Sequence, residues 1–359
     1  MQHGTPSLAE RIGRYRVVRL LGRGAMGQVV LARDPLLDRE VALKHLRSDV
    51  DLSPEQIEGL TRRMRHEAKA AARLSHPHLV ALHDIGEAEP VGLYLVFEYV
   101  EGPSLKRRLA RGRLTAREAA AVARQLGSAL SHAHAAGVVH RDVKPDNVIL
   151  SPRGARLGDF GIARLPDSTL TVPGGLIGTP AYSAPETIDD NRFSAQSDQF
   201  SLAATLFEAL SGRRAFPGDD ALDVAALVQT SDPPPFARAL ALDASVDDVL
   251  ARGLSKQPGE RFASCAELGD ALAEALELRY RPHMSTLPDE RHLALAVHAE
   301  PRRPRHGWLL AALLLALGMS LGVLVAGPVG AWLAPAGTGA ATSPGESPAD
   351  AGLPARSAP

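Results

Sequence analysis

The sequence predicts an α+β fold, with a strand-rich first third and a helical remainder, followed by a single transmembrane helix. Short apolar runs that read as strands gather between Tyr15 and Phe97, and longer runs with helical periodicity extend from there to Leu276. An uncharged segment then runs from Trp308 to Leu333. The 359 residues suffice for one large globular unit with appendages.

The composition is that of an ordinary globular protein. Hydrophobic residues make up 45% and charged residues 23%, and the formal net charge is -1. These values exclude an acidic disordered chain and a histone-like basic binder, so no nucleic-acid partner is expected. The single cysteine, Cys265, cannot form an intramolecular disulfide and excludes a cysteine-rich metal module, which suits a reducing compartment.

The strand-like runs of the first third predict an antiparallel meander. They read YRVVRLLG, QVVLARD and REVALKHL, with short polar turns such as Asp34-Pro35 between them. A helix is predicted from Pro54 to about Leu74, because Ser53 can cap its free amides and Gln56 can complete a capping box. A further strand-like run, GLYLVFEYV, closes this region.

Helices dominate from there to Leu276. Thr115 and Glu118 form a second predicted capping box in front of a helix with a regular apolar stripe. The stretch from Asp159 to Glu186 is rich in turn residues and interrupts the helices.

The C-terminal region is predicted to cross a membrane once. At about 1.5 Å rise per residue, a helix from Trp308 to Leu333 outspans a hydrocarbon core of roughly 30 Å, and a tryptophan lies near each end. A core helix that is apolar on all sides is the alternative. Arg302, Arg303 and Arg305 precede the segment, so the positive-inside rule keeps the residues before it in the cytoplasm.

These patterns divide the chain into five parts. No apolar stretch opens the chain, so no cleaved secretory signal is expected, and the protein is predicted to be a single-pass protein of the cytoplasmic (inner) membrane. The parts are an N-terminal extension (1–14), a globular domain (15–276), a juxtamembrane linker (277–306), the transmembrane helix (307–334) and a short disordered tail outside the cytoplasm (335–359).

Glycines at 22, 24 and 27, followed by Val29, form a G-x-G-x-x-G-x-V pattern. Dinucleotide-binding folds use the same glycine spacing, but there a helix follows at once, whereas here QVVLAR reads as a strand. A glycine-rich hairpin lets backbone amides close over phosphates. A P-loop is excluded because no Gly-Lys pair occurs in the chain.

Lysine is rare in this chain, occurring only at 44, 69, 106, 144 and 256, and two of these lysines lie in motifs. Lys44 follows Val-Ala-Leu in a predicted strand, where an ammonium group needs an anion, and Glu67 on the next helix can supply a carboxylate. Lys144 belongs to HRDVKPDN, which is followed by DFG at 159–161 and APE at 184–186. The carboxylate and amide oxygens of these motifs suit hard magnesium ions that also hold ATP phosphates.

With these five motifs in order, residues 15–276 resemble the eukaryotic-like (Hanks-type) bacterial serine/threonine protein kinases. The resemblance implies a bilobal fold, ATP and Mg²⁺ as cofactors, and transfer of the γ-phosphate to proteins. Lys144 in the catalytic loop and Thr179 in GTPAY are similar to the Ser/Thr rather than the Tyr branch.

The resemblance also implies a role for each motif residue. Asp142 would orient the substrate hydroxyl, Lys144 would lie near the γ-phosphate, and Lys44 would hold phosphates and pair with Glu67 when its helix is swung in. Asn147 and Asp159 would hold magnesium. The implied ATP-binding set is Leu21, Gly22, Arg23, Gly24, Ala25, Met26, Gly27, Gln28, Val29, Ala42, Lys44, Glu98 and Val100.

Two supports and a regulatory site follow from the same resemblance. Glu186 is expected to pair with Arg261, and Asp198 is expected to brace the backbone of the catalytic loop. Arg141 is expected to pair with a phosphate on the activation loop, for which Thr169 and Thr171 are the predicted phosphorylation sites. Two copies on one membrane face would favour a homodimer that autophosphorylates in trans.

Two other functions remain open from the sequence. A pseudokinase scaffold would bind nucleotide without transferring phosphate, and a small-molecule phosphotransferase would use a related fold. The complete set of motif residues disfavours the scaffold. The GTPAY and APE segments, which shape a peptide site in protein kinases, disfavour the small-molecule enzyme.

Overall fold

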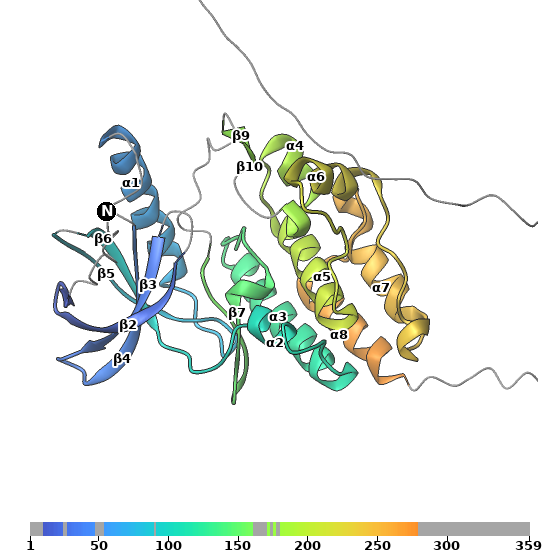
Figure 1. Cartoon of the computed structure of the whole chain (residues 1–359), viewed down its shortest axis with the longest axis horizontal. Helices are drawn as coiled ribbons and strands as arrows, with labels where there is room; N and C mark the ends of the chain where they lie inside the picture. The colour runs from blue at the N-terminus through green and yellow to red at the C-terminus, as the bar shows by residue number, and fades with distance from the viewer. Residues whose placement is uncertain are drawn as a thin grey trace, which may run out of the picture. The chain divides into compact units, whose positions relative to one another are not determined.

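The structure is a computed structural model that describes residues 10–23, 27–46, 54–89, 91–160, 171–172, 175–176 and 180–278. Figure 1 shows a twisted sheet with one long helix beside it, joined to a larger group of helices. The predicted transmembrane segment, the tail and the linker after Leu278 lie outside the described residues. Within the described residues, no helix is both long enough and apolar enough to cross a membrane.

The N-terminal lobe is a six-stranded antiparallel sheet in the order β1-β2-β3-β4-β6-β5. Its strands are β1 (Arg11–Ile12), β2 (Tyr15–Arg23), β3 (Gly27–Asp34), β4 (Arg39–Leu46), β5 (Leu82–Ala88) and β6 (Gly92–Glu98). The predicted meander is therefore confirmed in β2, β3 and β4. Val30, Val41, Leu43 and Val96 form a small core on one face, because alternate side chains of a strand share a face.

The opposite face of the sheet joins the main core of the molecule. Leu95 and Phe97 from β6 pack there together with Met64 and Ala68 from α1 (Pro54–Ala71). The helix begins where the sequence predicts and ends slightly earlier than predicted. Its proposed cap, Ser53, lies outside the described residues.

The C-terminal lobe is built around helix α5 (Ala195–Ser211), of which nearly every residue is buried. Helix α3 (Ala116–Ala135) begins with the predicted capping box between Thr115 and Glu118, which is confirmed. It packs closely on α8 (Cys265–Glu277), because a Cβ atom at Gly269 would lie only 2.4 Å from the carbonyl oxygen of Ala123.

Shorter elements complete this lobe. They are α2 (Leu105–Leu109), η1 (Pro145–Asn147), β7 (Val148–Ser151), β8 (Gly154–Leu157), β9 (Thr171–Val172), β10 (Gly175–Leu176), η2 (Pro180–Tyr182), α4 (Pro185–Asp190), α6 (Ala221–Thr230), η3 (Arg238–Leu240), α7 (Ser245–Gly253) and η4 (Pro258–Glu260). The hairpin of β7 and β8 follows η1 directly, so it holds the catalytic loop on one side and the DFG motif on the other.

Candidate active site

The loop from His140 to Asn147 is held by a buried carboxylate from α5. Asp198 is 1% exposed and accepts hydrogen bonds from the backbone N–H groups of His140 (2.7 Å) and Arg141 (2.8 Å). Arg141 has φ 69°, a left-handed conformation that a non-glycine residue keeps only when its surroundings enforce it. The predicted bracing role of Asp198 is therefore confirmed.

His140 links this loop to the DFG motif. Burial lowers its pKa, which keeps the ring neutral, and its Nε2 lies 3.1 Å from the carbonyl oxygen of Gly158. Its Nδ1 accepts the backbone N–H of Asp142 at 3.3 Å. The ring also packs on Phe160 with 4.6 Å between the ring centroids. One buried imidazole thus sets the backbone of Asp142 relative to Asp159.

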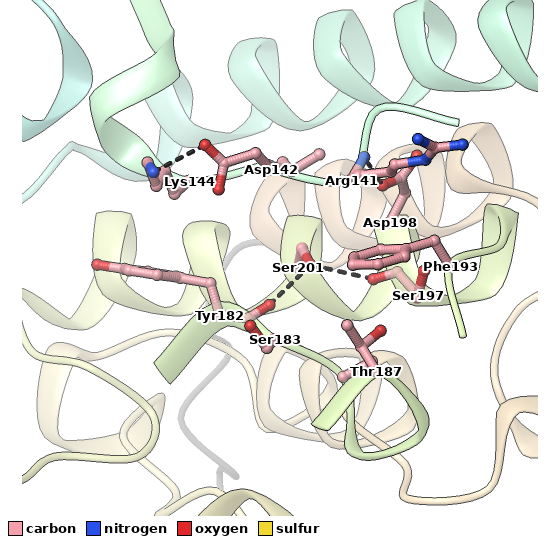
Figure 2. Close-up of a pocket in the computed structure, with 12 residues that line it drawn as sticks. Arg141, Asp142, Lys144, Tyr182, Ser183, Thr187, Phe193, Ser197, Asp198 and Ser201 are labelled. Carbon is pink, nitrogen blue, oxygen red and sulfur yellow. Dashed lines mark hydrogen bonds and ion pairs between the residues drawn. The ribbon is translucent and has the colours of Figure 1, made fainter. Parts of the chain in front are cut away.

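The Asp142 carboxylate is positioned by two other predicted site residues. The Asn147 amide donates to its Oδ2 at 2.9 Å and to its backbone carbonyl oxygen at 2.7 Å, and the Lys144 Nζ lies 2.7 Å from Oδ2. Asp142 lines a pocket in which it and Lys144 lie opposite Tyr182, Ser183 and Thr187 (Figure 2). The carboxylate can therefore receive a hydroxyl group that enters between the catalytic loop and the η2–α4 segment.

Lys44 and Glu67 do not pair with each other in this structure. Lys44 Nζ contacts the Asp159 carboxylate, and the Arg141 guanidinium contacts the Glu67 carboxylate. Asp159 comes from the DFG motif and Arg141 from the catalytic loop, so both ion pairs join the two lobes, as does the pair of Arg156 with Glu98. The sequence predicts a Lys44–Glu67 pair when α1 is swung in toward the sheet. Because the pair is absent here, the structure corresponds to α1 in the position that is not swung in.

Strand pairing places Val29, Ala42 and Lys44 of the predicted nucleotide site on one face of the sheet. Val29 lies opposite Lys44, Leu31 opposite Ala42, and Ala42 opposite Phe97. Gly22 pairs with Val29 at the start of the glycine hairpin. A Cβ atom at Gly27 would lie 3.0 Å from the carbonyl oxygen of His45, so the backbones approach closely there and leave little room for a side chain.

Of the other members of the ATP-binding set, Arg23, Gln28 and Glu98 pair in register with residues of the opposite face of the sheet. Leu21 and Arg23 are exposed in β2, Gln28 contacts the His45 ring, and Val100 is half-buried. The Glu98 side chain turns toward Arg156. Gly24, Ala25 and Met26 lie outside the described residues.

The activation loop is described only in part. Thr169 lies outside the described residues, and Thr171 belongs to β9, where only its backbone is described. The Arg141 Nε is buried and has no hydrogen-bond partner among the described residues. This orphan donor is consistent with a basic site for an anion.

Three features of the site were not predicted from the sequence. His134 on α3 lies 2.8 Å from Asp198, the Tyr182 hydroxyl contacts Glu208 on α5, and Glu67 pairs with Arg141. The position of His134 at the end of the amphipathic helix, shortly before HRD in the sequence, could have indicated that it lies close to the catalytic loop. The other two pairs join residues far apart in sequence, so no local pattern indicates them.

The model for the protein kinase domain matches residues 15–272. The chain belongs to the protein kinase family. The kinase domain has the bilobal architecture of that family, with the strand-rich lobe and the helical lobe described above.

Curated relatives include two bacterial kinases. The chain is 42% identical over 283 residues to serine/threonine-protein kinase PknA of Mycobacterium tuberculosis (strain H37Rv), an alignment that covers 77% of this chain and 64% of PknA. It is 38% identical over 269 residues to serine/threonine-protein kinase PknE of Mycobacterium bovis, covering 74% of this chain and 47% of PknE. The chain therefore spans just under two thirds of PknA and about half of PknE.

Among solved structures, the kinase domain resembles the crystal structure of Rad53 1-466 in complex with AMP-PNP. The TM-score is 0.60 at 23% sequence identity, and the match covers 72% of this chain and 65% of that chain. This likeness supports the fold.

Proposed function

We propose that the chain is an ATP-dependent serine/threonine protein kinase that transfers the γ-phosphate of MgATP to Ser and Thr hydroxyls of proteins, including itself, in bacterial signal transduction. The observation that carries the proposal is the Asp142 carboxylate, which Asn147 and Lys144 hold at a pocket between the catalytic loop and the η2–α4 segment. The names of the relatives support the Ser/Thr class.

Asp142 accepts or orients the proton of the substrate hydroxyl, because its carboxylate is fixed and faces the pocket. Lys144 sits 2.7 Å from that carboxylate and can neutralise charge on the transferred group. Lys44 holds the nucleotide phosphates once Asp159 no longer occupies its ammonium group. Since phosphoryl transfer is largely electrostatic, these residues act by positioning and by charge neutralisation.

The residues present fit Mg²⁺. Asp159 has a carboxylate that is 40% exposed, and Asn147 has an amide oxygen, which are the hard oxygen ligands that Mg²⁺ prefers. Mg²⁺ commonly uses only one or two protein ligands together with substrate phosphates, so this pair is sufficient. When bound, the ion neutralises charge on the phosphates.

The proposal is tested by incubating the full-length chain with ATP labelled on the γ-phosphate and Mg²⁺, with a generic Ser/Thr protein substrate and, separately, with a panel of small metabolites. Label on serine or threonine of protein is the expected result. Label on metabolites alone would establish a small-molecule phosphotransferase. Nucleotide binding with no transfer to any acceptor would establish a pseudokinase scaffold.

Activation is proposed to exchange ion pairs at Arg141. A phosphate on Thr169 or Thr171 adds about -1.5 to -2 charge, which competes with Glu67 for the guanidinium. Glu67 is then released to pair with Lys44.

The double variant Thr169→Ala/Thr171→Ala is expected to lose at least tenfold in protein phosphorylation, measured as initial rate after preincubation with MgATP. Ser151→Ala, a hydroxyl in β7, is the control and should keep the wild-type rate, whereas full activity of the double variant would exclude this loop as the switch.

The membrane anchor and the homodimer are also proposed. Anchoring through residues 307–334 would hold the kinase domain at the cytoplasmic face of the inner membrane and raise its local concentration. Autophosphorylation in trans is then expected, with a rate per molecule that rises about in proportion to protein concentration in detergent micelles. A rate per molecule that stays constant over a hundredfold dilution would contradict trans transfer.

A further inference from the structure

Three histidines meet where the N-terminal lobe rests on the C-terminal lobe. His76 and His78 lie in the loop between α1 and β5, and His132 lies on α3. The ring centroid of His76 is 5.7 Å from that of His78 and 5.3 Å from that of His132. His76 and His78 are half-buried and His132 is exposed. We call these three side chains the histidine joint.

The loop that carries His76 and His78 fastens the end of α1 to the C-terminal lobe. Its backbone pairs with β8, since Val80 N–H donates to the Leu157 carbonyl and Leu157 N–H donates to the His78 carbonyl, both at 2.9 Å. Arg156 adds a guanidinium bond to the Leu79 carbonyl oxygen at 2.8 Å. Because α1 also carries Glu67, the geometry of this loop sets where that carboxylate lies.

The hydrogen bonds of His76 require one protonation state. The backbone N–H of His78 donates to its Nδ1 at 3.1 Å, so Nδ1 must be without a proton. Nε2 therefore carries the hydrogen and donates to Ser128 Oγ on α3 at 3.1 Å. A proton added to Nδ1 would set two donors against each other and break the bond to His78. Both ring nitrogens are thus in use, which leaves none to ligate a metal ion.

The charges around His76 also favour its neutral form. Burial lowers its pKa, and the charges of His132, His78 and Arg156 lower it further. Arg156 on β8 is itself paired with Glu98 at the end of β6, so this carboxylate is already engaged. Ser128 is the only other polar side chain that the described contacts place against the His76 ring.

We propose that the histidine joint is a pH-sensitive positioning device that holds α1 on the C-terminal lobe when neutral and releases it when protonated. The direction of the pH dependence of stability follows from the difference in proton binding between the folded and unfolded chain. The unfolded chain binds the His76 proton more readily than the folded chain, so folded-state stability is lost as pH falls below the unfolded value of about 6.5. Loosening the loop lets Glu67 drift, so catalysis should fall over the same range. This last step rests on the proposed kinase activity, whereas the effect on the loop does not.

The test uses the full-length chain and compares His76→Asn with wild type. An asparagine at this position keeps an acceptor for the His78 N–H, as in an Asx turn, and does not titrate. His66→Gln, on the exposed face of α1, removes an equal number of histidines and serves as the control. Unfolding midpoint, hydrogen-exchange protection of residues 75–80 and initial kinase rate are each measured at pH 7.5 and 6.0.

Wild type and the control should lose about 2–3 °C in unfolding midpoint, and up to about fourfold in protection of residues 75–80 and in rate, on going to pH 6.0, the most that one titrating imidazole can supply over this range. His76→Asn should lose less than half as much in each. His132→Gln removes a neighbour that lowers the His76 pKa, so the folded and unfolded values lie closer together and its losses of midpoint and protection at pH 6.0 should also be smaller than in wild type. An unchanged acid transition in His76→Asn would overturn the proposal. If the chain has no kinase activity, the unfolding and hydrogen-exchange measurements still test whether the histidine joint is pH-sensitive.

Discussion

Replacing Asp142 with asparagine is expected to lower the rate constant of phosphoryl transfer by about 10²- to 10⁴-fold, the usual contribution of a positioned acid–base group. The amide is nearly the same size as the carboxylate, so the bond from Asn147 and the pocket should survive. It cannot accept a proton from the substrate hydroxyl. The Michaelis constant for ATP should change less than threefold, because Asp142 acts on the acceptor rather than on the nucleotide.

The measurement is the initial rate with γ-labelled ATP at saturating protein substrate, together with the unfolding midpoint. Asp146→Asn is the matched control, because Asp146 is an exposed carboxylate in the same loop. It should keep a rate within threefold of wild type. A rate for Asp142→Asn within tenfold of wild type, at an equal unfolding midpoint, would remove Asp142 from the catalytic role.

Replacing Arg261 with alanine is expected to have the largest effect on stability. The Arg261 side chain is 0% exposed and Glu186 is 7% exposed, and the guanidinium binds the carboxylate through two bonds of 2.7 and 2.9 Å. This pair, which the sequence predicted, is confirmed. Removing one partner of a buried pair leaves an uncompensated charge and costs about 3–5 kcal/mol. The unfolding midpoint should fall by roughly 10 °C, at about 2–4 °C per kcal/mol for a domain of this size.

Arg124→Ala is the control for this prediction. Arg124 pairs with Glu277, but their side chains are 40% and 59% exposed, so solvent screens the pair and its loss should destabilise the fold far less than the loss of Arg261. The double variant Arg261→Met/Glu186→Leu removes both charges and should recover part of the midpoint. A midpoint for Arg261→Ala within 2 °C of wild type would show that Glu186 is satisfied in another way.

The loss of Arg261 should also reach the active site. Glu186 lies in the first turn of α4, shortly after η2, and η2 and α4 provide Tyr182 and Thr187 to the pocket opposite Asp142. Arg261 further donates to the carbonyl oxygens of Gln196 and Ser255, both at 2.9 Å. The pair therefore ties the pocket wall to the body of the C-terminal lobe.

Local patterns predicted the parts of the fold that depend on neighbours in sequence. The strands of the meander follow from apolar alternation, and the capping box of Thr115 and Glu118 spans only three residues. Strand β5 (Leu82–Ala88) was not predicted, because it contains Asp84, Gly86 and Glu87 and its residues are mostly half-buried. It becomes a strand because β6 offers a free edge, which is a tertiary condition.

The sequence by itself determined the chemistry of this protein. The order and spacing of the glycine hairpin, Lys44, HRDVKPDN, DFG and APE identify the kinase domain, because each motif needs its residues at short fixed separations. Only the tertiary structure decided that Lys44 meets Asp159, that Glu67 meets Arg141 and that the His76 ring contacts the His132 ring. Ion-pair energies change steeply over a few ångströms, and those distances depend on how α1 and its loop rest on the C-terminal lobe. No local pattern contains that placement.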